Sequence, residues 1–104
     1  MALLAQAADE CQEAFNEYKV YKEMSSTLSK ISNKVRKDED TRKGLDKLEE
    51  QLKNGEFHAG RGASGEARLF FKYSDKEKGA VEIIGESDKD DETRVINNLI
   101  KNYE

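Results

Sequence analysis

The residues with the greatest capacity for chemistry lie in the stretch HAGRGASGEARLFFK, which spans positions 58 to 72. It contains His58, the only histidine of the chain, together with Arg61, Arg68 and Lys72. An imidazole can move a proton near neutral pH, and guanidinium groups can neutralise a developing phosphorane without a metal ion. RNA cleavage by transesterification needs both, because the 2′-hydroxyl must lose a proton while the phosphate gathers negative charge. The pattern therefore predicts a ribonuclease site.

Each of these residues also has a plainer interpretation. A single histidine is more often a surface or packing residue than a catalyst, and Arg68 and Lys72 could line a solvated strand face. Phe70 lies between them in the sequence. It could stack a base if it is exposed, or it could be a core residue covered by a helix. Lys89, which follows the next apolar segment, could reach the same face as His58.

The segment GRGASG matches G-x-G-x-x-G at Gly60, Gly62 and Gly65. A dinucleotide-binding loop needs a strand before this motif and a helix after it. Here the pattern predicts a helix before it and a strand after it, which excludes that interpretation. A flexible turn remains, either purely structural or one whose backbone N–H groups approach a phosphate.

Two further charged segments are candidate binding sites. The segment SKISNKVRK contains Lys34 and Arg36, which could contact an RNA backbone or belong to an ordinary solvated helix face. The segment SDKDDE lacks the glycine and the twelfth-position glutamate of a calcium loop, so its acids are expected to cap a helix.

Composition limits the possible classes of protein. The chain has 104 residues, a net charge of −4 and one cysteine, Cys11. This length suits a single domain, and the charge argues weakly against nucleic acid, although a local basic groove is compatible with it. No apolar run approaches the length of about 18 residues that reads as a membrane span, and the N-terminus does not resemble a signal peptide. One cysteine and one histidine cannot build a metal cluster, so we expect no metal and no cofactor.

The helices are predicted from apolar residues at three- and four-residue spacing. Residues 2 to about 35 are predicted as one long helix, or as two helices joined near the serine-rich segment SSTLS. A second helix is predicted from about residue 40 to 53, where Asn54 and Gly55 end it.

The second half of the chain changes to a period of two, which is typical of strands. It predicts a β-hairpin at 66–74 and 80–86, a third strand within 56–64, and a closing helix. The fold class is therefore α+β in a single domain, with a helical half at 1–54 and a sheet with its closing helix at 55–104. One sheet face should be the core, formed by Leu69, Phe71, Tyr73, Val81 and Ile83. The other face should be only partly covered, and it carries Arg68, Phe70, Lys72 and Glu82.

From position 65 onward the chain resembles small bacterial ribonuclease toxins, the group that unites barnase, EndoU, colicin-type and RelE-like folds. The matching positions form a strand, a second strand and a helix: Gly65, Arg68, Leu69, Phe70, Phe71; Val81, Glu82, Ile83, Ile84, Gly85, Ser87, Lys89; Val95, Ile96, Leu99, Lys101, Tyr103. The resemblance implies metal-independent cleavage of tRNA or mRNA. It also implies a role in a toxin–antitoxin pair or in bacterial competition, with a cognate antitoxin or immunity protein as partner. The expected location is the cytoplasm of the producing or a target cell.

Together these observations predict an endoribonuclease in which His58 transfers protons and Arg61 and Arg68 stabilise phosphate charge. Lys72 is a second phosphate contact or an alternative base, and Lys89 completes the site. The residues expected to contact RNA are Phe70, Ser87, Lys34 and Arg36. This interpretation requires the groups to converge on an uncovered sheet face. Two alternatives stay open, a non-enzymatic interaction protein (an antitoxin, immunity protein or adaptor) and a nucleic-acid-binding module without catalysis.

Overall fold

The computed structural model describes residues 17–56 and 60–103 of the chain. Within these residues, three helices and a four-stranded mixed sheet form an α+β fold, so the expected fold class is confirmed. The elements in chain order are β1 (Lys19–Lys22), α2 (Ser26–Val35), α3 (Glu39–Lys53), β2 (Arg61–Ser64), β3 (Ala67–Tyr73), β4 (Ala80–Asp88) and α4 (Glu92–Tyr103).

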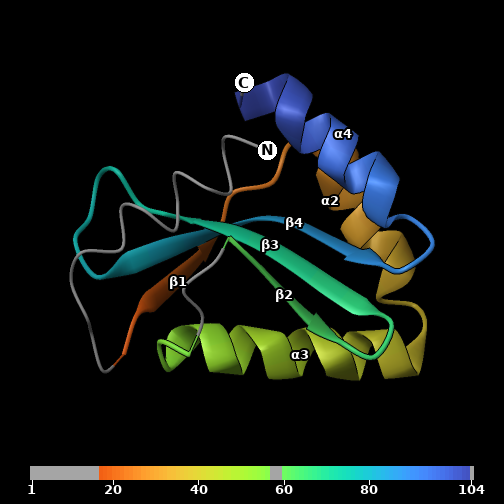
Figure 1. Ribbon diagram of the computed structural model, residues 1–104, viewed down its shortest axis with the longest axis horizontal. Helices are drawn as coiled ribbons and strands as arrows, with labels where there is room; N and C mark the ends of the chain where they lie inside the picture. Colours follow the sequence, from red (N-terminus) through yellow and green to blue (C-terminus); the bar gives the residue numbers. More distant parts are fainter. Residues whose placement is uncertain (1–16, 57–59, 104) are drawn as a thin grey trace.

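The sheet has the strand order β1-β4-β3-β2 (Figure 1). β3 and β4 form the predicted hairpin, and β2 is the predicted third strand, antiparallel to β3. Only Gly65 and Glu66 separate β2 from β3, and Gly65 has a φ of 57°. A two-residue hairpin turn needs a positive φ at its first central position when it is of type II′, and glycine adopts that angle at little cost.

The first strand corrects the predicted long N-terminal helix. Residues 19–22 form β1, which pairs in parallel with β4 from Lys19 opposite Ala80 to Lys22 opposite Ile83. Val20 and Tyr21 suit a strand, and the edge of β4 supplies the hydrogen-bonding partner that a local pattern does not reveal. The part of the prediction that covers residues 1–16 lies outside the described residues.

The two following helices agree with the sequence pattern. α2 begins after Ser25, whose hydroxyl accepts a hydrogen bond from the Leu28 backbone N–H. A helix boundary therefore lies in the serine-rich segment, although a strand and not a second helix precedes it in the described residues. α3 begins after Asp38, which caps the N–H of Thr41 in the same way. It ends at Lys53, before Gly55 with a φ of 72°.

Helices cover both faces of the sheet, with α3 on one side and α4 on the other (Figure 1). Gly44 of α3 lies so close to β3 that a Cβ there would be 2.7 Å from the Cβ of Ala67. Gly85 of β4 faces α4, where a Cβ would be 3.1 Å from Val95 Cγ1. The closely approaching backbones bury the sheet between two helical layers.

A bulge changes which side chains of β4 face each layer. Phe70 pairs with Gly85 and Phe71 pairs with Ile83, so Ile84 is the extra residue on β4. Before the bulge Val81 and Ile83 share a face with Phe71, as predicted. After it the alternation is shifted by one residue, and Glu86 pairs with Leu69 on that same face. A charged side chain is thereby directed into the interior.

The core extends through both layers, and this decides between the two interpretations of Phe70. Phe70 has an exposed fraction of 0%, and it packs with Gly85 beneath α4. The face that carries it is therefore covered at its centre, while Arg68, Lys72 and Glu82 at its margins are partly exposed. In the part of the chain that the structure describes, no helix has the length and apolarity that crossing a membrane requires.

Candidate functional site

Arg61 and Arg68 are brought together by the pairing of β2 with β3. Arg61 lies opposite Phe70 and Ala63 lies opposite Arg68, so both arginines are on the sheet face that α4 covers. The first residue of α4, Glu92, lies at the same place. Arg61 Nη1 is 3.7 Å and Arg68 Nε is 3.5 Å from one oxygen of its carboxylate, Oε2.

The two arginines differ in how firmly they are held. Arg68 Nη1 donates hydrogen bonds to the carbonyl oxygens of Gly65 at 2.6 Å and Ala67 at 2.9 Å, and its side chain is 18% exposed. The side chain of Arg61 is 56% exposed, and the contact with Glu92 is its ion pair among the described residues. The β2–β3 turn thus holds the Arg68 side chain in place, whereas the Arg61 side chain is more exposed and less restrained.

These residues line a shallow pocket of about 370 Å³. We call it the arginine pocket, and its described lining residues are Arg61, Gly62, Ala63, Arg68 and Glu92. Two guanidinium groups that flank one anionic oxygen form a site suited to a phosphate or a carboxylate, because guanidinium donors match both in geometry. Glu92 adds an acceptor for a proton beside that position. The arrangement can bind a phosphodiester and provide acid–base chemistry next to it.

Sequence reasoning missed the part played by Glu92. Its position in an acidic segment before a helix favoured a capping role, and α4 does begin there. The signal that could have identified it is an acid at the start of a helix that must cross a strand face carrying two arginines.

Neither Lys72 nor Lys89, two other predicted catalytic residues, lines this pocket. His58 is outside the described residues. Lys89 is exposed in the turn between β4 and α4, and it is not among the residues that line the pocket. The structure therefore joins Arg61 and Arg68 but does not bring Lys89 to them.

Lys72 belongs to a different depression of the surface. Its Nζ lies 3.3 Å from Glu82 Oε1 and 3.5 Å from Asp75 Oδ2. Burial lowers the pKa of Lys72, but the charges of Glu82 and Asp75 and their hydrogen bonds outweigh it and raise the pKa above its ordinary value. A raised pKa does not favour the expected role of Lys72 as an alternative base, and that role stays a prediction.

Phe70 and Ser87 are not accessible to RNA, so the prediction that they contact it is wrong. Both side chains have an exposed fraction of 0%. Phe70 is a core residue under α4, which is the second of the two interpretations that its sequence position allowed. Ser87 pairs with Arg68 across β3 and β4, and its buried hydroxyl has no hydrogen-bond partner among the described residues.

Lys34 of α2 and Arg36, the residue that caps the C-terminal end of α2, do not line the arginine pocket. Lys34 is exposed and pairs with Asp91 at 3.1 Å. Arg36 is 19% exposed and its guanidinium is held by the carboxylate of Glu86, with Nη2 2.6 Å from Oε2. Arg36 therefore stabilises the buried carboxylate of Glu86, and its expected role as an RNA contact stays a prediction.

Within the part of the chain that the structure describes, the candidate site comprises two arginines and one glutamate at the edge of a covered sheet face. Among the described residues, no group of three or more His, Cys, Asp or Glu side chains is placed to hold a metal ion. Comparison with protein-family models, with curated proteins and with solved structures finds no match to this chain.

Proposed function

We propose that this protein is a metal-independent endoribonuclease that cleaves cellular RNA, either tRNA or mRNA, in the arginine pocket. The observation that carries the proposal is the contact of Arg61 and Arg68 with a single oxygen of Glu92. A phosphodiester oxygen also carries negative charge and accepts hydrogen bonds from guanidinium groups. It can therefore compete for the same donors.

In the proposed reaction the 2′-hydroxyl of the substrate attacks the adjacent phosphorus. The carboxylate of Glu92 accepts the hydroxyl proton, and Arg61 and Arg68 stabilise the negative charge of the phosphorane. The bond from phosphorus to the 5′-oxygen then breaks, which leaves a 2′,3′-cyclic phosphate. The departing oxygen takes up a proton, and His58 stays the sequence-based prediction for its donor.

The resemblance of residues 65–104 to bacterial ribonuclease toxins supports a biological role of the same kind. The protein would act in the cytoplasm of the producing or a target cell and inhibit translation and growth. A cognate antitoxin or immunity protein would then bind it and block the arginine pocket.

A non-enzymatic interaction protein is the second candidate, and two observations favour it. Phe70 is buried, and Lys72 and Arg36 are each held by carboxylates away from the arginine pocket. Of the four described residues assigned to catalysis from the sequence, only Arg61 and Arg68 share a pocket. An adaptor, antitoxin or immunity protein needs no such cluster.

The test is cleavage of purified tRNA and mRNA in the presence of EDTA, with product ends analysed for 2′,3′-cyclic phosphate. We expect Arg61→Ala and Arg68→Ala each to lower the rate about 10²- to 10³-fold, as loss of a charge-stabilising donor does. We expect Glu92→Gln to lower it about 10²- to 10⁴-fold, as loss of a general base does. Arg42→Ala is the matched control, because Arg42 is an exposed arginine of α3 that pairs with Asp46.

Four outcomes would decide against the proposal. RNA that stays intact at high protein concentration favours the interaction protein, as does free expression without growth arrest. Binding of RNA without cleavage favours a nucleic-acid-binding module. Cleavage that Arg61→Ala and Glu92→Gln leave unchanged points to a contaminating nuclease. Thermal melts of each variant show whether a lost rate reflects lost structure.

A further inference from the structure

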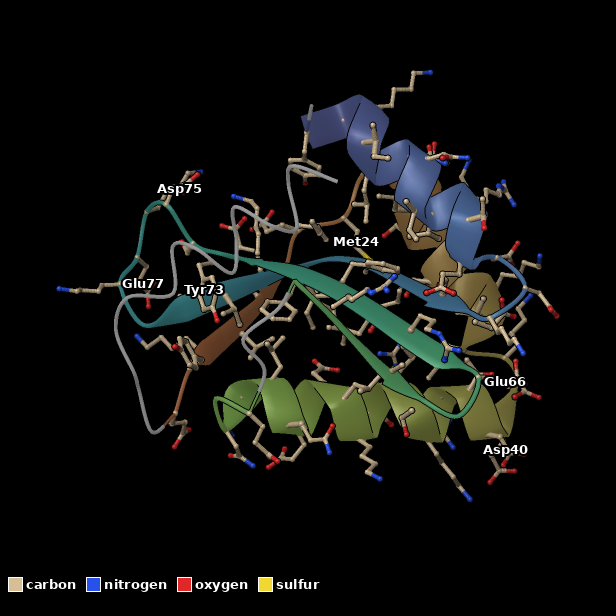
Figure 2. The ribbon with its side chains drawn as sticks, in the orientation of Figure 1. Met24, Asp40, Glu66, Tyr73, Asp75 and Glu77 are labelled. Atoms are coloured by element: carbon tan, nitrogen blue, oxygen red, sulfur yellow. The ribbon has the colours of Figure 1, made fainter. Side chains whose placement is uncertain are left out.

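A second and larger depression, of about 750 Å³, lies between β1, the turn after β3 and the C-terminal end of α4. We call it the tyrosine groove. Figure 2 shows Asp75 and Glu77 on the β3–β4 turn and Met24 toward α4, and all three residues line it. It shares none of its described lining residues with the arginine pocket.

Two exposed aromatic side chains line this groove. Tyr21 and Tyr103 are the exposed large hydrophobic residues of the described chain, at 41% and 40%. The hydroxyl of Tyr21 donates a hydrogen bond of 2.8 Å to Glu77 Oε1, which restrains the position of its ring. Exposed tyrosines gathered in one depression are typical of binding surfaces, because each offers a large area at a low cost in conformational entropy.

The groove has an excess of negative charge. Its described lining includes four carboxylates and two ammonium groups: Glu23, Asp75, Glu77, Glu82, Lys72 and Lys76. Lys72 is neutralised by Glu82 and Asp75, and Lys19 contacts Glu77 at 3.4 Å. Glu23 makes no ion pair within the described residues, and the side chain of Asp75 is 78% exposed. The groove therefore attracts cations and repels a nucleic-acid backbone.

We propose that the tyrosine groove binds a basic, flexible segment of a partner protein. Its lysine and arginine cations lie over the rings of Tyr21 and Tyr103 and against the carboxylates beside them. Charge complementarity selects this occupant, since aromatic faces and carboxylates are the two groups that attract guanidinium and ammonium ions. The binding site is independent of the proposed ribonuclease activity.

The test is fluorescence anisotropy with a short labelled peptide rich in arginine and lysine, spaced by glycine and serine. A second peptide of the same length carries glutamate in place of each cation. The titrations are done at about 0.15 M salt, where exposed charges more than about 8 Å apart are largely screened. We expect the basic peptide to bind and the acidic peptide not to bind. Tyr21→Ser and Tyr103→Ser should each weaken binding roughly two- to fivefold, as cation–π contacts at exposed sites do.

A matched pair of charge reversals distinguishes binding at this groove from attraction by the net charge of the protein. Glu23→Lys places a cation in the groove, whereas Glu66→Lys makes the same change at the opposite end of the molecule (Figure 2). We expect Glu23→Lys to weaken binding and Glu66→Lys to leave it unchanged. Amide NMR shifts on adding the peptide should be largest at Ser74 and Asn102, which line the groove, and small at Gly62.

Several results would overturn the proposal. Equal weakening by Glu23→Lys and Glu66→Lys would show attraction by net charge alone. Amide shifts centred on Gly62 would place the peptide at the arginine pocket. A peptide that fails to bind, with the groove filled by another segment of this chain or by a second copy seen in sedimentation, would exclude a basic partner segment.

Discussion

The guanidinium group of Arg36 forms an ion pair with the buried carboxylate of Glu86. Arg36 Nε lies 2.9 Å from Oε1 and Nη2 lies 2.6 Å from Oε2, which is a bidentate pair. The Ser32 hydroxyl donates a further hydrogen bond to Oε1, and Arg36 Nη1 reaches Asp46 of α3 at 3.1 Å. One buried carboxylate thereby links α2 and α3 to β4.

We expect Arg36→Met to lower the free energy of unfolding by about 3–5 kcal/mol, because it leaves the carboxylate of Glu86 buried without its partner. Replacing both residues, as Arg36→Met with Glu86→Leu, should cost less than Arg36→Met alone. Urea denaturation measures both. Arg42→Met removes only an exposed pair with Asp46 and should cost less than about 1 kcal/mol. A similarly small loss for Arg36→Met would show that the buried pair is unimportant.

The stability of the protein should fall in acid through Glu86. Burial opposes ionisation of this carboxyl, but the hydrogen bonds from Arg36 and Ser32 outweigh it and hold its pKa below the ordinary 4.5. The folded state therefore binds the proton less readily than the unfolded state. The contribution is complete above the unfolded pKa and is lost as pH falls through the folded pKa.

Urea titrations between about pH 5 and pH 3 should show a shallower decline for Glu86→Gln than for the natural protein. Asp38, whose pKa is lowered by hydrogen bonds from the backbone and hydroxyl of Thr41, titrates in both and supplies part of the slope that remains. Parallel curves for the two proteins would contradict the assignment of acid sensitivity to Glu86.

Gly44→Ala should destabilise the protein although alanine favours helices. The gain in helix propensity is about 1 kcal/mol, whereas overpacking a close contact costs about 1–3 kcal/mol. The new Cβ would lie 2.7 Å from Ala67 Cβ and 2.9 Å from the Ser64 carbonyl oxygen. Lys47→Ala, at an exposed position of the same helix, should be nearly neutral. Thermal melts that rise for Gly44→Ala would show that α3 and the sheet are less closely packed.

Phe70→Ala should reduce the free energy of unfolding by about 3–5 kcal/mol, the usual cost of removing a buried phenylalanine. A residue that stacks a base would behave differently, with weaker RNA binding at unchanged stability. Denaturation and RNA-binding titrations on the same sample distinguish the two. Unchanged stability would show that Phe70 is exposed, and it would support the predicted role of Phe70 in stacking a base.

Ser87→Ala should stabilise the protein by about 1 kcal/mol or more, since a buried hydroxyl without a partner costs about 1–3 kcal/mol. Ser87→Thr keeps the hydroxyl and adds a methyl group, so it should be destabilising in the same packed position. Differential scanning calorimetry of the variants checks this. A marked loss of stability in Ser87→Ala would indicate that the hydroxyl has a partner after all.

The sequence alone determined those elements whose signal is local. Leu45, Leu48 and Leu52 recur along one stripe, and α3 forms there with all three buried. Alternating residues indicated the strands of the second half, and the segment that contains Gly65 indicated a turn, which lies between β2 and β3. Side-chain periodicity, caps and turn residues act within a few positions of one another, so they can be read before any tertiary contact is known.

Only the tertiary structure decided which groups meet. Residues 19–22 form a strand because β4 provides an edge for them, and the bulge at Ile84 turns Glu86 inward to Arg36. Phe70 is buried because α4 crosses it, and the same crossing brings Glu92 to Arg61 and Arg68. These contacts join positions about 20 to 60 residues apart, and their geometry depends on strand register and helix placement. No local spacing encodes either quantity, because both arise from packing between distant segments.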